Sequence, residues 1–180
     1  MAVLSGLGCN ATEVRTVSEL DGVDALVIPG GESTTIGRLA RIYGLIEPLR
    51  DRITSGMPVL GTCAGMIFLG VATTGVDQPQ LAVLDVVVER NAFGRQVDSF
   101  EGDVLVLGRD RPIHAVFIRA PWIAKVGAAV EVLAVVVDAT TGEEHPVFVR
   151  QGKILATSFH PELTGDSSVH EMLLELVGTS

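Results

Sequence analysis

A cysteine between two glycines is the first feature of this sequence that could do chemistry. Cys63 stands in the string GTCAG, residues 61–65, directly after an apolar run. The pattern is typical of a nucleophile elbow, in which a sharp turn between a strand and a helix exposes the nucleophile. A side chain at Gly61 or Gly65 would collide with that turn. At the start of a helix, Cys63 would also feel the partial positive charge that favours a thiolate.

A histidine and a glutamate late in the chain supply the groups that such a thiol needs. They stand in the string SFHPE, residues 158–162. In an extended segment residues two apart face the same way, so His160 and Glu162 can share a face. Glu162 could then accept a hydrogen bond from one imidazole nitrogen while the other nitrogen addresses Cys63. A cysteine is more often a small buried apolar residue, and a lone histidine is more often structural. The flanking glycines and the spaced carboxylate favour catalysis and predict a cysteine hydrolase.

Acyl transfer also needs hydrogen-bond donors for the oxyanion that forms during the reaction. The backbone N–H of Ala64, directly after the nucleophile, is one candidate. Gly31, in the Pro-Gly-Gly loop at residues 29–31, is the other. By itself a double glycine after a strand usually indicates only a turn.

The other histidines and the second cysteine lack such partners in the sequence. His145 precedes a proline as His160 does, but no carboxylate follows at the matching place, so we assign it to a loop. His114 is expected in a strand and His170 on a helix, both as structural residues. Cys9 is assigned to packing or to the surface. No group of His, Cys and carboxylates has the spacing of metal ligands, so we predict neither a metal nor a cofactor.

Composition limits the class of protein. The 180 residues, 47% of them apolar and 19% charged, predict a single domain over residues 1–180. A net charge of −9 argues against nucleic acid and against an anionic membrane surface as partners. No apolar run approaches the roughly 20 residues that cross a bilayer, so no membrane span is expected. The first residues are a poor secretory signal, and two cysteines fit a reducing cytoplasm.

The elements expected to position the chemical groups alternate between strand and helix in the first part of the chain, which predicts a parallel sheet with helices on both faces. Ser33 or Thr34 is expected to cap the helix after the first strand. From Leu84 onward β segments dominate. Strands are expected at 24–28, 58–60, 86–88, 104–107, 113–118, 130–137, 147–149 and 154–158, a hairpin turn at 138–144, and helices at about 47–54, 64–69 and 167–177.

Five strings resemble one known family: PGGEST at 29–34, GTCAG at 61–65, VVVERNAFGRQVDSFE at 86–101, FIRAP at 117–121 and SFHPEL at 158–163. GTCAG and HPE alone resemble the class I, triad-type glutamine amidotransferases. The string ERNAFGRQVDSFE resembles their vitamin B6 branch, the glutaminase subunits of pyridoxal phosphate synthase. The similarity covers nearly the whole chain from about Asp21. It implies a three-layer α/β fold with a doubly wound, mostly parallel sheet.

The resemblance also implies roles for individual residues. Cys63 would attack the side-chain amide of L-glutamine, His160 would act as general base and then as general acid, and Glu162 would orient His160. Ammonia would leave first, and water would then release glutamate. An arginine suits the α-carboxylate because its planar fork can grip it bidentately. The residues that fall where the family binds glutamine are Gly31, Glu32, Ser33, Arg90, Ile118 and Arg119.

A partner protein is implied as well. In the family, ammonia passes to a barrel-shaped synthase subunit of a hetero-oligomeric complex, which assembles pyridoxal phosphate from a pentose phosphate and a triose phosphate. The resemblance further implies that the oxyanion loop at Gly30 and Gly31 is set correctly only when that subunit docks.

The chain departs from the family at its beginning. Relatives start with a further strand and a Gln-Gly loop before the helix that is expected here near Ala2, so about 20 residues, including a central strand, are expected to be absent. The strands beside it would then be left as unpaired edges. Two alternatives stay open: a catalytically silent docking subunit, and a glutaminase of another pathway such as histidine or cobalamin synthesis. The second does not explain the string at 90–101.

Overall fold

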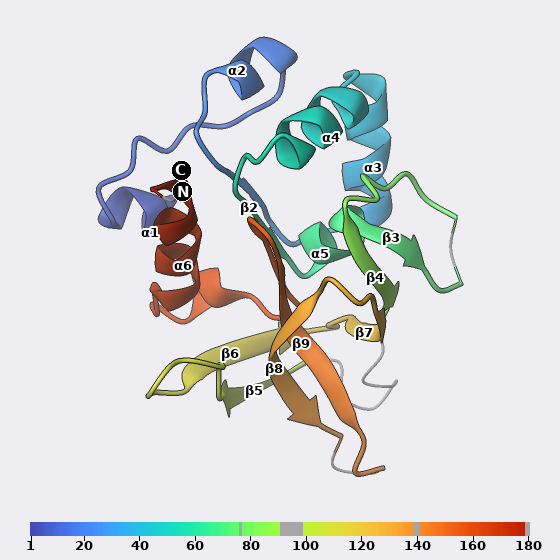
Figure 1. Cartoon of the computed structure of the whole chain (residues 1–180), viewed down its shortest axis with the longest axis vertical. Helices are drawn as coiled ribbons and strands as arrows, with labels where there is room; N and C mark the ends of the chain where they lie inside the picture. The colour runs from blue at the N-terminus through green and yellow to red at the C-terminus, as the bar shows by residue number, and fades with distance from the viewer. Residues whose placement is uncertain (76, 91–98, 139–140, 179–180) are drawn as a thin grey trace.

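A five-stranded sheet forms the centre of the computed structural model, which describes residues 1–75, 77–90, 99–138 and 141–178 (Figure 1). Three neighbouring strands of this sheet are parallel, and two further strands continue it in antiparallel orientation. In spatial order the strands are β1 (Leu26–Ile28), β2 (Val59–Thr62), β10 (Ile154–Thr157), β9 (Glu144–Gln151) and β8 (Glu131–Val137).

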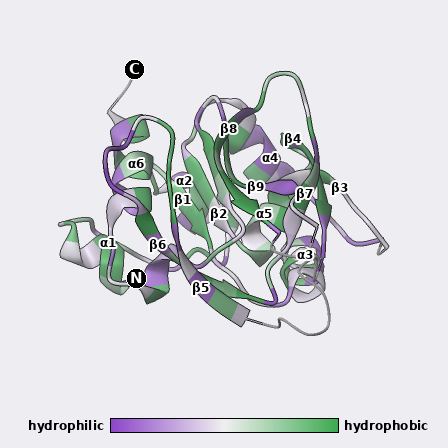
Figure 2. Cartoon of the chain, turned by 90° about the horizontal axis from the view of Figure 1, so that it is seen from below, coloured by the Kyte–Doolittle hydropathy of each residue, from purple (hydrophilic) through white to green (hydrophobic). Residues whose placement is uncertain are grey.

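Helices cover both faces of the sheet because its central strands bury apolar side chains on both sides. Along β2, Val59 belongs to one hydrophobic cluster and Leu60 to the other, and along β10 Ile154 and Leu155 divide in the same way. The first cluster contains side chains of α4 (Ile46–Thr54) and α5 (Ala64–Leu69), and the second those of α6 (Ser168–Val177). Figure 2 shows hydrophobic residues concentrated along the central strands.

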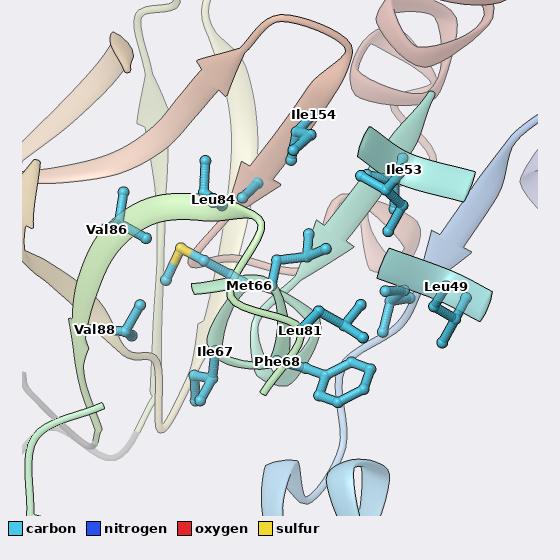
Figure 3. Packing of buried hydrophobic residues seen from close by; sticks show 14 of the residues in the cluster. Leu49, Ile53, Met66, Ile67, Phe68, Leu81, Leu84, Val86, Val88 and Ile154 are labelled. Atoms are coloured by element: carbon cyan, nitrogen blue, oxygen red, sulfur yellow. The ribbon is translucent and has the colours of Figure 1, made fainter. Parts of the chain in front are cut away.

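Residues of α5 form the centre of the first cluster. Figure 3 shows Met66, Ile67 and Phe68 packed between α4 and β4 (Leu84–Glu89). Every residue of α5 is buried, so this short helix is held by packing on all sides and not by a polar outer face. The turn that precedes α5 is therefore fixed to the core of the molecule.

The remaining elements flank this core. A three-stranded sheet has the order β3-β4-β7, and a separate hairpin joins β5 to β6. Two short helices precede β1, and one of them, α1, lies beside α6 (Figure 1). The bounds of these elements and of the helix after β1 are α1 (Ala2–Gly6), α2 (Val17–Asp21), α3 (Ser33–Ile42), β3 (Gly70–Thr73), β5 (Ser99–Val104), β6 (Ile113–Ile118) and β7 (Trp122–Val126).

The predicted three-layer α/β class is confirmed, and its parallel part is the segment β1-β2-β10. Among the described residues β1 pairs only with β2 and forms one edge of the sheet. Every helix of the described part is too short or too polar to span a bilayer.

Three local predictions were wrong. The helix α3 is capped by Glu32 and not by Ser33 or Thr34, because the helix begins at Ser33 and the glutamate side chain before it accepts from the free N–H groups of Thr34 and Thr35. His145 lies within β9 and not in a loop. Of the strand expected at 104–107 only Val104 belongs to β5, since the residues after it leave the hairpin.

The hairpin expected at 138–144 lies between β8 and β9, although residues 139–140 are outside the described part. The N–H of Asp138 donates to the carbonyl of Glu143 at 2.8 Å, and its side chain accepts from the N–H of Thr141 at 3.0 Å. An aspartate that bonds its own turn is the reason why such residues favour hairpins.

Candidate active site

Cys63 occupies the turn between β2 and α5. Its φ of 51° is positive, a conformation that residues other than glycine rarely adopt. The neighbouring glycines are required by packing: a Cβ at Gly65 would lie 2.0 Å from the carbonyl oxygen of Ile28, and one at Gly61 would lie 2.6 Å from Leu69 Cδ1. The strand, sharp turn and helix predicted around Cys63 are thus all present, with the strain that is common at functional sites.

His160 lies directly beyond the end of β10, the strand that neighbours β2. The register pairs Thr62 with Thr157, and the N–H of Cys63 donates to the carbonyl of Thr157 at 2.7 Å. This ladder places the ring of His160 beside the Cys63 side chain, close enough for the sulfur to act on the pKa of the ring, although the two residues are far apart along the chain. The two neighbouring parallel strands β2 and β10 therefore place Cys63 and His160 close together beyond their carboxyl ends.

Glu162 holds the other side of the same ring. Its Oε1 lies 2.8 Å from His160 Nδ1, and both residues belong to the tight turn at the 3₁₀ helix η1 (Pro161–Leu163). The N–H of His160 donates to the carbonyl of Val116 at 2.9 Å, which fixes the backbone from the side of β6. The structure thus brings together the sulfur, the imidazole and the carboxylate that the sequence analysis selected.

Protonation of His160 is favoured by both of its neighbours. The hydrogen bond with Cys63, followed by that with Glu162, raises the pKa of His160 to about 9, although burial acts in the opposite direction. Burial is the largest single influence on the Glu162 carboxyl and raises its pKa. The hydrogen bond from His160, a backbone hydrogen bond and the charges of His160 and His170 together exceed it and leave that pKa below its ordinary value. A protonated ring can stabilise negative charge on the adjacent sulfur and can give a proton to a leaving amine.

The loop with the double glycine passes directly against the histidine ring. A Cβ at Gly30 would lie 2.2 Å from His160 Cε1, and the N–H of Gly30 donates to Thr62 Oγ1 at 3.1 Å. Gly31 has a φ of 144°, which strains any side chain. Ala64 is the first residue of α5 and is 2% exposed. Both candidate oxyanion donors therefore lie in segments that adjoin Cys63 or His160.

Glu32 and Arg90 meet at the start of α3. The Glu32 carboxylate accepts from the N–H groups of Thr34 at 3.1 Å and Thr35 at 2.7 Å. Hydrogen bonds from the side chains of these two threonines lower its pKa to about 2. Arg90 Nη2 lies 3.5 Å from Glu32 Oε1. An ionised carboxylate beside a guanidinium is an arrangement that suits a zwitterionic ligand.

Ser33 is held by a residue that the sequence analysis missed. Its side chain is 2% exposed, and its Oγ donates to Gln78 Oε1 at 3.0 Å. Gln78 is itself buried, and its Nε2 has no hydrogen-bond partner within the described part of the chain. No sequence pattern marks Gln78, because the contact joins residues 45 positions apart.

Ile118 and Arg119 lie at the end of β6, two and three residues beyond the Val116 carbonyl that anchors His160. Both are exposed, and Arg119 has a positive φ of 44°. Backbone strain of this kind is common at ligand-binding sites, and Arg119 directly follows β6, the strand that bonds the backbone of His160. Residues 91–98, most of the string that marks the vitamin B6 branch, lie outside the described part.

Two histidines without a catalytic assignment have partners that the sequence did not reveal. The ring of His145 stacks on Trp122 with centroids 3.7 Å apart. His114 lies in β6, as predicted, between Asp103 Oδ1 at 3.0 Å and Glu101 Oε2 at 3.2 Å, which face it across the β5–β6 hairpin. The described residues contain no group of His, Cys, Asp and Glu arranged for a metal.

Comparison with known proteins agrees with the motifs. A protein from Frankia alni named Pyridoxal 5'-phosphate synthase subunit PdxT is 56% identical over 180 residues, which cover 98% of this chain and 87% of the relative. A protein of the same name from Parafrankia sp. is 58% identical over 173 residues, 94% of this chain and 82% of the relative.

Comparison with solved structures agrees with these sequence similarities. One described as a glutamine amidotransferase has a TM-score of 0.91 and 52% identity, and the match covers 99% of this chain and 92% of that chain. The structure of PurLQS from Thermotoga maritima, with a TM-score of 0.61, 15% identity and coverage of 86% of this chain and 80% of that chain, shares the fold. The family model for the SNO glutamine amidotransferases matches residues 2–178. The resemblance inferred from the motifs is thus confirmed, and the chain belongs to the SNO glutamine amidotransferase family.

Proposed function

We propose that this chain hydrolyses L-glutamine to L-glutamate and ammonia as the glutaminase subunit of a pyridoxal 5'-phosphate synthase. One observation carries the proposal: the side chains of Cys63, His160 and Glu162 form a connected series at one edge of the sheet. The name shared by relatives at 56% and 58% identity supports the synthase as the context of the reaction.

The reaction divides into two acyl transfers. The Cys63 sulfur reacts as a thiolate beside protonated His160 and attacks the side-chain amide carbon of glutamine. His160 gives its proton to the leaving nitrogen as the C–N bond breaks and ammonia departs. Water then attacks the thioester, and the now neutral His160 accepts one of its protons. Cleavage of the C–S bond restores the thiolate beside protonated His160 and releases glutamate, whose carboxyl group gives the second proton of the water to solvent. Glu162 keeps the His160 ring oriented and stabilises its charge throughout both steps.

Two backbone N–H groups stabilise the oxyanion of each tetrahedral intermediate in this proposal. That of Ala64 follows the nucleophile directly, and that of Gly31 belongs to the loop packed on His160. Preorganised donors of this kind typically contribute about 3 kcal/mol of transition-state stabilisation each.

The ends of glutamine away from the amide bind to charged groups at the start of α3 and at the end of β6. Arg90 receives the α-carboxylate, and Glu32, whose pKa of about 2 keeps it ionised, receives the α-ammonium group. The substrate then partly replaces the contact between Arg90 and Glu32. Ser33, Ile118 and Arg119 complete the substrate site.

The ammonia passes to a barrel-shaped synthase subunit in a hetero-oligomeric complex. The word subunit in the names of the relatives supports a partner for this chain. Docking is proposed to set the Gly30–Gly31 loop for catalysis. No cofactor takes part in the glutaminase step itself.

Glutamate release in the presence of the cognate synthase subunit tests the proposal. Cys63→Ala should abolish release while the chain still binds the synthase subunit. Cys9→Ala is the matched control, because Cys9 lies outside the site, and it should retain the wild-type rate. Equal release by wild type and Cys63→Ala would refute the mechanism. A catalytically silent docking subunit would bind without any turnover, so release by the wild type eliminates that alternative.

A further inference from the structure

A buried histidine of α6 has no role in the mechanism described above. His170 is 3% exposed and lies on the helix face that also buries Val169 and Leu173. Its Nδ1 is buried and has no hydrogen-bond partner within the described residues. A buried polar atom without a partner is unfavourable and is rare in folded proteins. An aliphatic side chain would fill this position at lower cost, so the imidazole requires another reason.

Glu162 has a buried hydrogen-bond acceptor without a partner. Its Oε1 is bonded to His160 Nδ1, but Oε2 is buried without a partner. Among the described residues it is the one buried side-chain oxygen in this condition. An ionised carboxylate oxygen accepts hydrogen bonds, and the Nδ1 of a neutral imidazole donates one in the appropriate tautomer. The two unused atoms are therefore an acceptor and a donor.

The two side chains also influence each other electrostatically. His170 helps to lower the pKa of Glu162, and Glu162 acts to raise the pKa of His170. Burial has the larger effect on His170, and together with the amino group of Met1 it leaves the pKa of His170 below its ordinary value. At neutral pH His170 is thus an uncharged ring that can offer an N–H to the carboxylate.

We propose that His170 is a positioning residue for the catalytic triad: its Nδ1–H holds Glu162 Oε2, directly or through one bound water, so that Oε1 stays on His160. This inference rests on the proposed glutaminase function. It extends the connected series from Cys63 through His160 and Glu162 to a fourth residue on α6. The helix that covers one face of the sheet would in this way fix the orientation of the catalytic base.

Removal of the donor tests this role. His170→Leu keeps an apolar side chain of similar size but leaves Glu162 Oε2 without a donor, so protonation of Glu162 becomes easier. We expect kcat to fall about tenfold with KM nearly unchanged, and the acidic limb of the kcat/KM profile to move up by about one pH unit. The other charged groups near the pair, His160 and the amino group of Met1, are the same in every variant.

A conservative variant separates hydrogen bonding from packing. His170→Asn places an amide nitrogen where Nδ1 stands and should recover most of the rate and the position of the acidic limb. His170→Gln places its amide at the position of Nε2 and should recover less. Leu173→Val is the matched packing control, because it loosens the same buried face of α6 without a change in polarity. It should keep the wild-type kcat and acidic limb.

A second measurement does not depend on glutamine hydrolysis. The pKa of the Glu162 carboxyl can be followed by carbon NMR in chain labelled at glutamate carboxyls, with Glu162→Gln to assign the signal. It should rise in His170→Leu and not in Leu173→Val. If this rise occurs while the wild type releases no glutamate, the proposed function fails and the contact stands. An unchanged Glu162 pKa, or a loss of rate that Leu173→Val reproduces and His170→Asn does not recover, overturns the inference.

Discussion

At the scale of single residues, the chemistry of the site depends on the protonation state of the His160 imidazole. His160 is held between Cys63 and Glu162, and these two contacts raise its pKa to about 9. A ring that is protonated at neutral pH begins the reaction as an acid, whereas the second step requires it as a base. The balance between the two states depends on both neighbours, first on Cys63 and then on the Glu162 carboxylate behind the ring.

The first prediction concerns this carboxylate. In Glu162→Gln the bond to His160 Nδ1 loses its negative charge, so the pKa of His160 should fall towards its ordinary value of 6.5. Glutamate release should decrease by roughly 10- to 100-fold because the ring is less well oriented and less stabilised as a cation. Proton NMR titration of the ring reports the pKa.

Glu101→Gln provides the matched control. It removes one carboxylate from His114, the other histidine with a raised pKa, which is raised by Asp103 and then by Glu101. The pKa of His114 should fall while glutamate release stays at the wild-type rate. A normal rate in Glu162→Gln would contradict the role given to Glu162.

The second prediction follows from the direction of the same pKa shift. The folded-state pKa of His160 lies above its unfolded value, so its contribution to stability is fully present below pH 6.5 and is lost as the pH rises through about 9. Wild type should therefore lose its stability advantage over His160→Asn between these values. Urea denaturation of both proteins at pH 6 and at pH 9.5 measures it, and a constant difference would count against the shift.

At this scale a functional residue could be predicted from the sequence where its neighbours in the chain determine the local backbone geometry. Cys63 could be identified because the glycines on both sides are required by the turn itself. His170 and Gln78 could not be recognised, because their significance depends on partners supplied by other elements of the fold. A buried histidine on a helix and a glutamine in a loop look ordinary in a sequence.

At the scale of elements, the elbow depends on the close approach of α5 to β1. A Cβ at Gly65 would lie 2.0 Å from the Ile28 carbonyl oxygen, which is backbone and cannot rotate away. Strand β1 and helix α5 must therefore touch without any side chain between them. The same contact limits how far the turn with Cys63 can move.

The third prediction tests this contact. Gly65→Ala should reduce the free energy of unfolding by about 3 kcal/mol, since strand and helix must separate to admit the methyl group. Gly102→Ala, in β5, should change it by less than about 0.5 kcal/mol, because no atom lies within 4 Å of the added Cβ. Urea denaturation compares the two. Similar losses in both variants would show that the backbone contact is not the cause.

Most elements could be predicted from periodicity, but their ends and caps depended on longer-range contacts. The helices α4, α5 and α6 lie where the apolar spacing indicated. The cap of α3 is Glu32 and not Ser33, because the Glu32 carboxylate accepts from the N–H groups of Thr34 and Thr35. The sequence predicts a loop at His145 because no carboxylate follows it at the place that Glu162 has after His160. His145 lies in β9, where its backbone pairs with Val136 of β8 and its ring stacks on Trp122 of β7.

At the scale of the whole molecule, the active site lies on one of the two hydrophobic clusters. Phe159 directly precedes His160, is fully buried, and packs against the rings of Phe117 at 5.6 Å and Phe148 at 6.1 Å. This aromatic group belongs to the cluster on the α6 side of the sheet. Packing on that side therefore supports the histidine directly.

The fourth prediction compares one large residue from each cluster. Phe159→Leu and Phe68→Leu should each lower the free energy of unfolding by about 1 to 3 kcal/mol, because both remove part of a fully packed ring. Phe159→Leu should in addition lower glutamate release, since it displaces the backbone that carries His160. Phe68→Leu should lower release less where the protein remains folded, because Phe68 lies at the end of α5 away from Cys63. Equal effects of the two variants on release would show that the aromatic group does not support the histidine.

The ladder between β2 and β10 has a consequence for the time at which the enzyme can first act. Translation produces Cys63 early, but its N–H bonds to Thr157, and both His160 and Glu162 follow β10. Until the ribosome has passed Glu162, the thiol has neither its base nor the strand that anchors its turn. A nascent chain is therefore unable to hydrolyse glutamine, and hydrolysis begins only after β10 has paired with β2.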